Sequence, residues 1–154
     1  MKVRAINNLL VGKQREELYR EAYKRIKIAK DYGFWLEIIT ICDSLIGDRL
    51  EALLAAINQQ KQSFRKFRPI GTMLKDNDDK FEHNGLPLIL INQLKEWAEG
   101  RNRLMHEMVK IREGETLEWD ARILLAKNVA QSGVKLTRKV QGACRKIIKN
   151  RPRD

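Results

Sequence analysis

The sequence predicts an all-α fold, a bundle of four main helices in a single domain spanning residues 1–154. Apolar residues recur three and four positions apart over long stretches, which is the helical period, and no strand-like alternation occurs. The length of 154 residues suits one domain with one core. Apolar residues make up 43% of the chain and charged residues 33%, which is typical of a soluble globular protein.

The first two helices are expected over residues 15–30 and from about 34 to 60. In the first, apolar side chains recur at helical spacing: Leu18, Ala22, Ile26 and Ala29. Gly33 then interrupts the pattern. The second stretch is apolar over a wide face, between Phe34 and Ile57, which predicts contacts on more than one side of that helix.

A long loop is expected between the second and third helices, over residues 64–86. This segment is rich in turn-forming residues, among them the polar run from Asp76 to Asp79 and the pair Asn84-Gly85. A connection of this length is unusual in a compact bundle, so it is expected to hold a short helical turn, a functional loop or a long crossover. The third helix is predicted from Pro87 to about Arg112, and the last from Leu117 to about Lys149, with Gly133 as a break or kink.

Positive charge gathers at the two ends of the chain. The net charge is +11, with +6 in residues 1–30, −2 in residues 31–132 and +7 in the basic helix and tail at 133–154. Such an excess attracts polyanions. A nucleic-acid-binding face is therefore predicted on the last helix, at Lys135, Arg138, Lys139, Arg145, Lys146 and Lys149, with a solvated outer face as the alternative.

The chain is expected to work in the cytoplasm. No apolar run approaches the roughly 20 residues that span a bilayer, and the N-terminus lacks the apolar core of a signal peptide. Cys42 and Cys144 form no CxxC pair, and Cys42 in its apolar run suits a reducing compartment. The two histidines, His83 and His106, are too far apart to suggest a zinc site, so neither a metal nor a cofactor is expected.

A polar trio stands out on the third predicted helix: Arg101, Asn102 and His106. Asn102 and His106 are four residues apart and share one side of a helix, and Arg101 flanks that side. Arg103 can pair with Glu99 and Glu107, but no carboxylate lies three or four residues from Arg101 or His106. Both must find partners in another segment, another chain or a ligand. Gly100 beside them suggests that another backbone approaches closely.

The pattern Arg101-Asn102-x-x-x-His106 resembles the R-(polar)-x3-H motif of the HEPN superfamily. The stretch from Phe34 to Ile57, with Asp43 to Leu50 inside it, resembles a core helix of that group. The resemblance implies a HEPN-like bundle that forms a homodimer and cleaves RNA without a metal at a site shared by two subunits. Toxin-type members carry Tyr two residues after the histidine, where this chain has Met108. That difference argues against regulation by modification of this position.

The chemistry that this resemblance implies has a physical rationale. Attack of a ribose 2′-hydroxyl on the adjacent phosphate needs a proton acceptor, a proton donor and positive charge near the phosphorane. In a two-fold dimer, two copies of His106 would move protons and two copies of Arg101 would stabilise the phosphorane oxygens, while Asn102 would orient phosphate or histidine. His83 is a less favoured second histidine. The products would end in a 2′,3′-cyclic phosphate.

Three functions remain open at this point. The first is an endoribonuclease of toxin or host-defence type, with RNA and a small antitoxin-like protein as partners. The second is a non-catalytic helical module that binds RNA or a protein, in which Arg101 and His106 make structural contacts. The third, a DNA-binding regulator, is disfavoured because no short helix-turn-helix pair stands out.

Overall fold

The computed structural model describes residues 2–59, 68–110 and 118–151, with side chains from residue 12 onward, and these residues form helices without any strand. The described helices are α1 (Lys2–Asp31), α2 (Trp35–Ile57), α3 (Ile70–His83), α4 (Leu88–Glu107) and α5 (Trp119–Lys149). The prediction of an all-α bundle is confirmed. The helix predicted to run to about Arg112 ends earlier, at Glu107, while the predicted start of the last helix at Leu117 and the tail at 152–154 lie outside the described residues.

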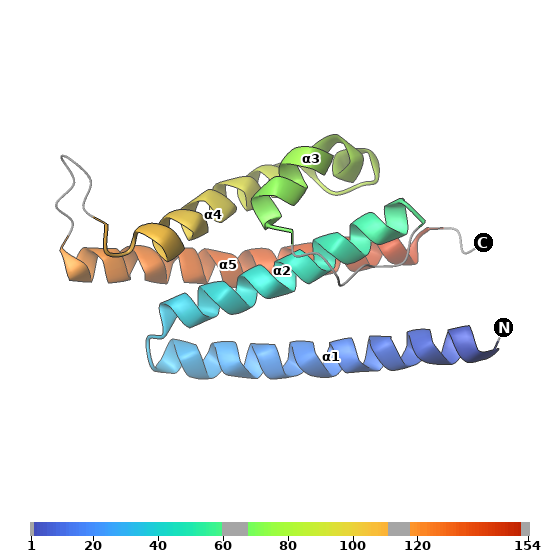
Figure 1. Ribbon diagram of the computed structural model, residues 1–154, viewed down its shortest axis with the longest axis horizontal. Coiled ribbons are helices and arrows are strands. Elements are labelled where there is room, and N and C mark those ends of the chain that lie inside the picture. The colour runs from blue at the N-terminus through green and yellow to red at the C-terminus, as the bar shows by residue number, and fades with distance from the viewer. Residues whose placement is uncertain (1, 60–67, 111–117, 152–154) are drawn as a thin grey trace.

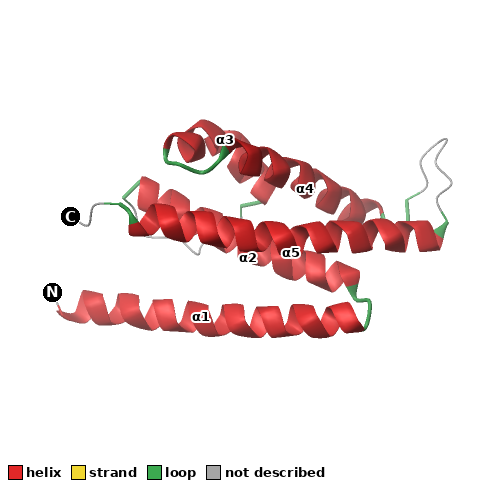
Figure 2. Cartoon of the chain, turned by 180° about the vertical axis from the view of Figure 1, so that it is seen from behind, coloured by secondary structure: helices red, strands yellow, loops and turns green. Residues whose placement is uncertain are grey.

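Helices α2 and α5 pack side by side at the centre of the bundle and run in the same direction (Figure 1). Helix α1 packs against α2 on one side, and α3 and α4 cover the other side. Seen from behind, α5 lies in front of α2 (Figure 2). One buried cluster draws side chains from all five helices, for example Ala29, Ile39, Phe81, Ile91 and Val140.

The predicted loop at 64–86 contains a helix, α3, so the expectation of four main helices with one long loop was wrong. The buried residues of α3 are Ile70, Met73, Leu74 and Phe81, spaced at one helical face. The polar run between Leu74 and Phe81 hid this pattern. The helix bends at Asn77, where φ is −138°, and Lys95 of α4 fastens it through Asp78 at 2.7 Å. The ammonium of Lys95 holds the pKa of Asp78 below its usual range.

Helix α1 begins well before residue 15, at Lys2. Its buried residues include Tyr19, Ile26 and Ala29, whereas Leu18, predicted on the apolar face, is exposed. Gly33 lies in the turn between α1 and α2 and has a φ of +72°, a left-handed conformation that favours glycine. The predicted break at this residue is therefore confirmed.

Gly133 does not break or kink α5, which runs uninterrupted from Trp119 to Lys149. A Cβ atom at position 133 would lie 2.9 Å from the Trp97 ring of α4. The Trp97 indole also donates a hydrogen bond to the carbonyl of Val129 at 2.9 Å. Glycine is present here because the indole packs directly against the α5 backbone. Over the part of the chain that is described, none of these helices combines the length and the apolar character needed to cross a bilayer.

Candidate functional site

Arg101 finds its partner in another segment of the same chain, Asp43 of α2. Its Nε donates to Asp43 Oδ1 at 2.9 Å, and its Nη2 donates to the same oxygen. Its Nη1 donates to Asn102 Oδ1. The two charged side chains are mostly buried, with 12% of Arg101 and 18% of Asp43 exposed. This pair fixes the guanidinium between α4 and α2.

Asp43 is the site residue that the sequence did not reveal. It lies in the segment that carries the second part of the resemblance, but helical periodicity does not say which helix faces which. The one sequence feature that could have pointed to Asp43 is its position as a carboxylate within a largely apolar run. Two of the five guanidinium N–H groups of Arg101 are not used in its bonds to Asp43 and Asn102.

His106 and Asn102 both lie on the exposed side of α4. Within the described residues, His106 makes no hydrogen bond or ion pair, so its imidazole is uncommitted. His106 comes nine residues after Trp97, or about two and a half helical turns, so the two side chains point to opposite sides of α4. Because Trp97 packs on α5, His106 points away from α5. The structure therefore brings Arg101 and Asn102 into contact and leaves His106 beside them on the surface.

The end of α4 that carries His106 is held in place by α5. The guanidinium of Arg122 donates hydrogen bonds to the carbonyls of Glu107, Met108 and Lys110 at 3.0–3.1 Å. These carbonyls at the end of a helix have no partner within the helix, and a cation there also suits the helix dipole. The position of His106 is thus set by two tertiary anchors, Arg122 on one side and Asp43 through Arg101 on the other.

Two expectations about the neighbours of the trio were wrong. In the described chain Arg103 forms no ion pair with Glu99 or Glu107. Met105 is 44% exposed, although Leu104 before it is buried. Gly100 is approached by a side chain rather than a backbone, since a Cβ there would lie 3.6 Å from Val129.

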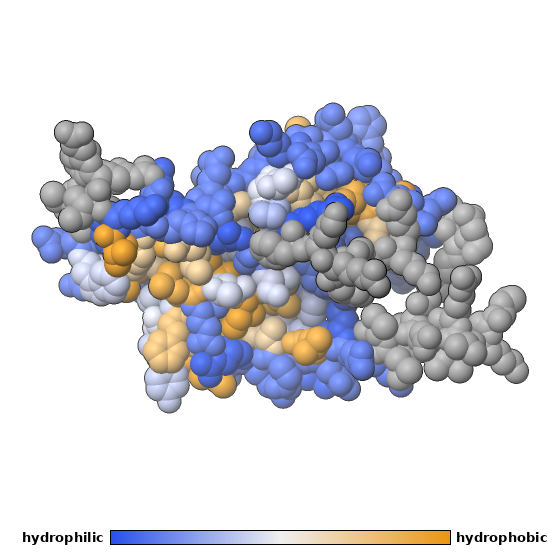
Figure 3. Space-filling model, in the orientation of Figure 1, coloured by the Kyte–Doolittle hydropathy of each residue, from blue (hydrophilic) through white to orange (hydrophobic). Residues whose placement is uncertain are grey.

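Apolar side chains are exposed next to His106 and at the adjoining start of α5. They are Met105, Val109, Trp119, Leu124 and Leu125, and Val109 is 82% exposed. Figure 3 shows apolar surface at the end of the molecule where α5 starts and α1 turns into α2. Exposed apolar groups that gather in one place are characteristic of contact surfaces.

The six basic residues predicted on the last helix share one exposed face of α5. Lys135, Arg138, Lys139, Arg145, Lys146 and Lys149 are all exposed, and their spacing places them within about a third of the helix circumference. This face is opposite the side that packs on α2, where Ala126, Ala130 and Cys144 are buried. The basic face and His106 therefore lie on different sides of the protomer.

His83 does not join the trio. It lies at the end of α3, where its Nδ1 is 2.7 Å from the carbonyl of Asp79. Helix α4 starts shortly after His83, and His106 lies 18 residues beyond that start, which is about 27 Å along the helix. Over the described residues, no group of three or more His, Cys, Asp or Glu side chains is placed to hold a metal ion.

Comparison with protein-family models, with curated proteins and with solved structures finds no match to this chain.

Proposed function

We propose that this chain is an endoribonuclease of HEPN type whose active site forms where two copies meet. The observation that carries the proposal is a guanidinium fixed by Asp43 and Asn102 on the same helix as an exposed, uncommitted imidazole. A fixed cation next to a free proton acceptor is what phosphodiester cleavage requires. The role that suits such an enzyme is that of a toxin or a host-defence protein in the cytoplasm.

The reaction needs two histidines, one from each copy. The imidazole of one His106 takes the proton of a ribose 2′-hydroxyl as its oxygen attacks phosphorus. The bond from phosphorus to the 5′-oxygen breaks, and the second His106 gives its proton to that oxygen. The remaining N–H groups of Arg101 stabilise the phosphorane, and Asn102 keeps the guanidinium oriented. The products are a 2′,3′-cyclic phosphate and a free 5′-hydroxyl.

Two surfaces support this proposal. Exposed Met105 and Val109 flank His106 and suit contact with the same surface of a second copy, which would exclude water from the site. The basic face of α5 suits the phosphate backbone of a substrate, because no carboxylate lies among its residues. A substrate long enough to reach both surfaces would be held by one and cut at the other.

Cleavage of labelled single-stranded RNA in the presence of EDTA tests the proposal. The expected result is a set of fragments ending in a cyclic phosphate, formed by the wild-type chain and reduced at least a hundredfold by His106→Ala. His83→Ala is the matched control and should cleave as the wild type does. Binding without cleavage, or full activity in His106→Ala, would contradict the proposal.

A second candidate is a non-catalytic module that binds RNA or a protein partner. The observation in its favour is the Arg101–Asp43 pair itself, because an internal ion pair that joins α4 to α2 also has a structural role. In that case Arg101→Ala and Asp43→Ala would change stability alone, and the wild-type chain would bind RNA without cutting it.

A further inference from the structure

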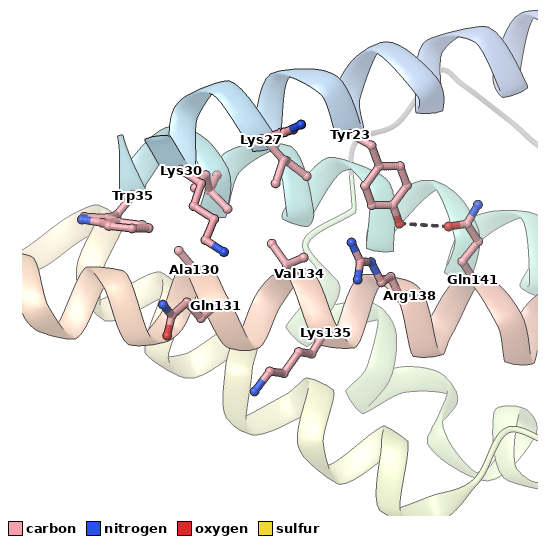
Figure 4. Close-up of a pocket in the computed structure, with 12 residues that line it drawn as sticks. Tyr23, Lys27, Lys30, Trp35, Ala130, Gln131, Val134, Lys135, Arg138 and Gln141 are labelled. Atoms are coloured by element: carbon pink, nitrogen blue, oxygen red, sulfur yellow. Dashed lines mark hydrogen bonds between the residues drawn. The ribbon is translucent and has the colours of Figure 1, made fainter. Parts of the chain in front are cut away.

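A groove of about 850 Å³ runs between α1 and α5, on the opposite side of α5 from α4 (Figure 4). Its floor is apolar and comes from three helices, with Ile26, Trp35, Ile38, Ala130 and Val134. Its rim is basic, with Lys27 and Lys30 from α1 and Lys135 and Arg138 from α5. Figure 4 shows the Lys30 amine and the Arg138 guanidinium pointing into the space between the two helices, whereas Lys135 points away from α1.

The cations of this groove lack the carboxylate partners that other cations in the structure have. Arg15, Arg25 and Arg101 each pair with an Asp or Glu on another helix. The groove lining contains neither Asp nor Glu, and no ion pair within the described residues involves Lys30 or Arg138. Like charges that face one another across a cleft repel, and a bound anion removes that cost.

Arg49 of α2 adds a buried cation beyond the groove floor. It follows Trp35 and Ile38 on the same side of α2, it is 9% exposed, and its Nε is buried without a hydrogen-bond partner. Its Cζ lies 4.4 Å from the centre of the Tyr19 ring of α1. In the described residues no carboxylate pairs with it. Arg49 does not line the groove, but its buried charge adds to the positive potential there.

Tyr23 and Arg138 line one end of the groove. The Tyr23 hydroxyl donates to Gln141 Oε1 at 2.9 Å. Burial raises the pKa of Tyr23, and the positive charges of Arg138, Arg49 and Arg145 act in the opposite direction. Positive charge from arginines of α2 and α5 at this end of the groove suits phosphate, and arginine binds phosphate through paired N–H groups.

We propose that the groove between α1 and α5 binds a single strand of RNA, with its phosphates at Lys30, Arg138 and Arg145 and a base against the floor at Trp35. Single-strand sites combine a basic track for the backbone with aromatic and apolar surface for the bases. A duplex keeps its bases stacked inside and cannot use such a floor. The apolar floor also suits an acidic amphipathic peptide, but the clustered arginines favour phosphate over carboxylate ligands that are spread along a helix.

This inference deepens the proposed function, on which its choice of RNA rests, because the groove would hold substrate on the side of the protomer away from His106. It also adds Lys30 and Trp35 as RNA-binding residues to the basic residues predicted on the last helix. A strand that leaves the groove would run along the exposed face of α5 past Lys146 and Lys149.

Fluorescence anisotropy with a labelled oligouridine of about twelve nucleotides tests the groove, with every protein in the His106→Ala background so that RNA is not cut. We expect Lys30→Gln/Arg138→Gln to raise Kd about tenfold near 0.1 M salt and to reduce the slope of log Kd against log salt by about 1.4. Adding Arg145→Gln should weaken binding further. Lys75→Gln/Lys80→Gln removes the same charge from α3 and should change Kd less than about twofold.

Equal effects of the groove variant and the α3 control would overturn the groove site. So would groove-dependent binding of labelled polyglutamate in the absence of RNA binding, which would identify an acidic protein as the occupant. Cleavage is scored separately in chains that retain His106. RNA binding in the groove without any cleavage would contradict the proposed enzyme and leave this inference standing.

Discussion

The ion pair between Arg101 and Asp43 is the residue-scale feature on which the candidate site depends. The sequence showed that Arg101 had no partner on its own helix, and the structure supplies one on α2. What the sequence could not give was the identity of that partner, because it depends on how α4 crosses α2. Asn102 and His106 share a helical side as the spacing predicted.

Asp43→Ala should destabilise the protein by about 2 kcal/mol, because it leaves a mostly buried guanidinium without its counter-charge. Urea unfolding followed by circular dichroism measures this change. Glu99→Ala, on the exposed side of α4, is the control and should change the free energy of unfolding by less than about 0.5 kcal/mol. A neutral Asp43→Ala would show that the pair does not hold Arg101.

Gly133 and Gly142 on α5 form a matched pair for a second prediction. Gly133→Ala should cost about 1–3 kcal/mol because the added Cβ meets the Trp97 ring, whereas Gly142→Ala should stabilise by about 0.5–1 kcal/mol. At Gly142 the position of a Cβ is open. Thermal unfolding of the two variants measures both signs, and stabilisation by Gly133→Ala would contradict the close packing of α4 on α5.

At the scale of elements, apolar periodicity predicted the helices with long, strongly apolar faces, α2, α4 and α5. It failed for α3, whose buried face has only four residues and is interrupted by a polar run. The turn-forming residues of this segment predicted a loop. In the structure Asp78 pairs with Lys95, and the Asn77 side-chain amide donates to the Met73 carbonyl at 3.0 Å. Tertiary contacts thus stabilise a helix that its local sequence disfavours.

The contact between α2 and α5 predicts a loss of stability at alkaline pH. Burial raises the pKa of Cys42 to about 11 and of Cys144 to about 12. In the unfolded chain both thiols ionise near pH 8.5, while in the folded chain they stay protonated, so unfolding becomes more favourable as pH rises from there towards 11. The free energy of unfolding should fall by about 4 kcal/mol between pH 8 and 10 from these two thiols, with an equal share from each.

Urea unfolding at both pH values, for the wild type and for Cys42→Ala/Cys144→Ala, isolates this contribution. Tyr19 and Tyr23 contribute alike to both proteins, so they cancel in the comparison. An identical dependence on pH in the two proteins would show that the thiols do not sense the α2–α5 contact.

At the scale of the whole molecule, three surfaces bear on the proposed function. They are the trio at the end of α4, the apolar groups beside it, and the basic groove between α1 and α5. The charge at the chain ends predicted the basic face of α5, since all six residues are exposed on one side. It did not predict the groove, because Lys30, Trp35 and Arg138 line one cavity only when α1 and α2 pack beside α5. The apolar surface near His106 was equally hidden, because exposure is a property of the fold.

The central claim is that one cleavage site requires His106 from two copies. Wild-type and His106→Ala chains, refolded together in equal amounts, should retain about one quarter of the RNA-cleaving activity of the same total of wild-type chains, because only dimers with two wild-type subunits are active. An activity of about one half would mean that each chain works independently, and it would contradict the shared site.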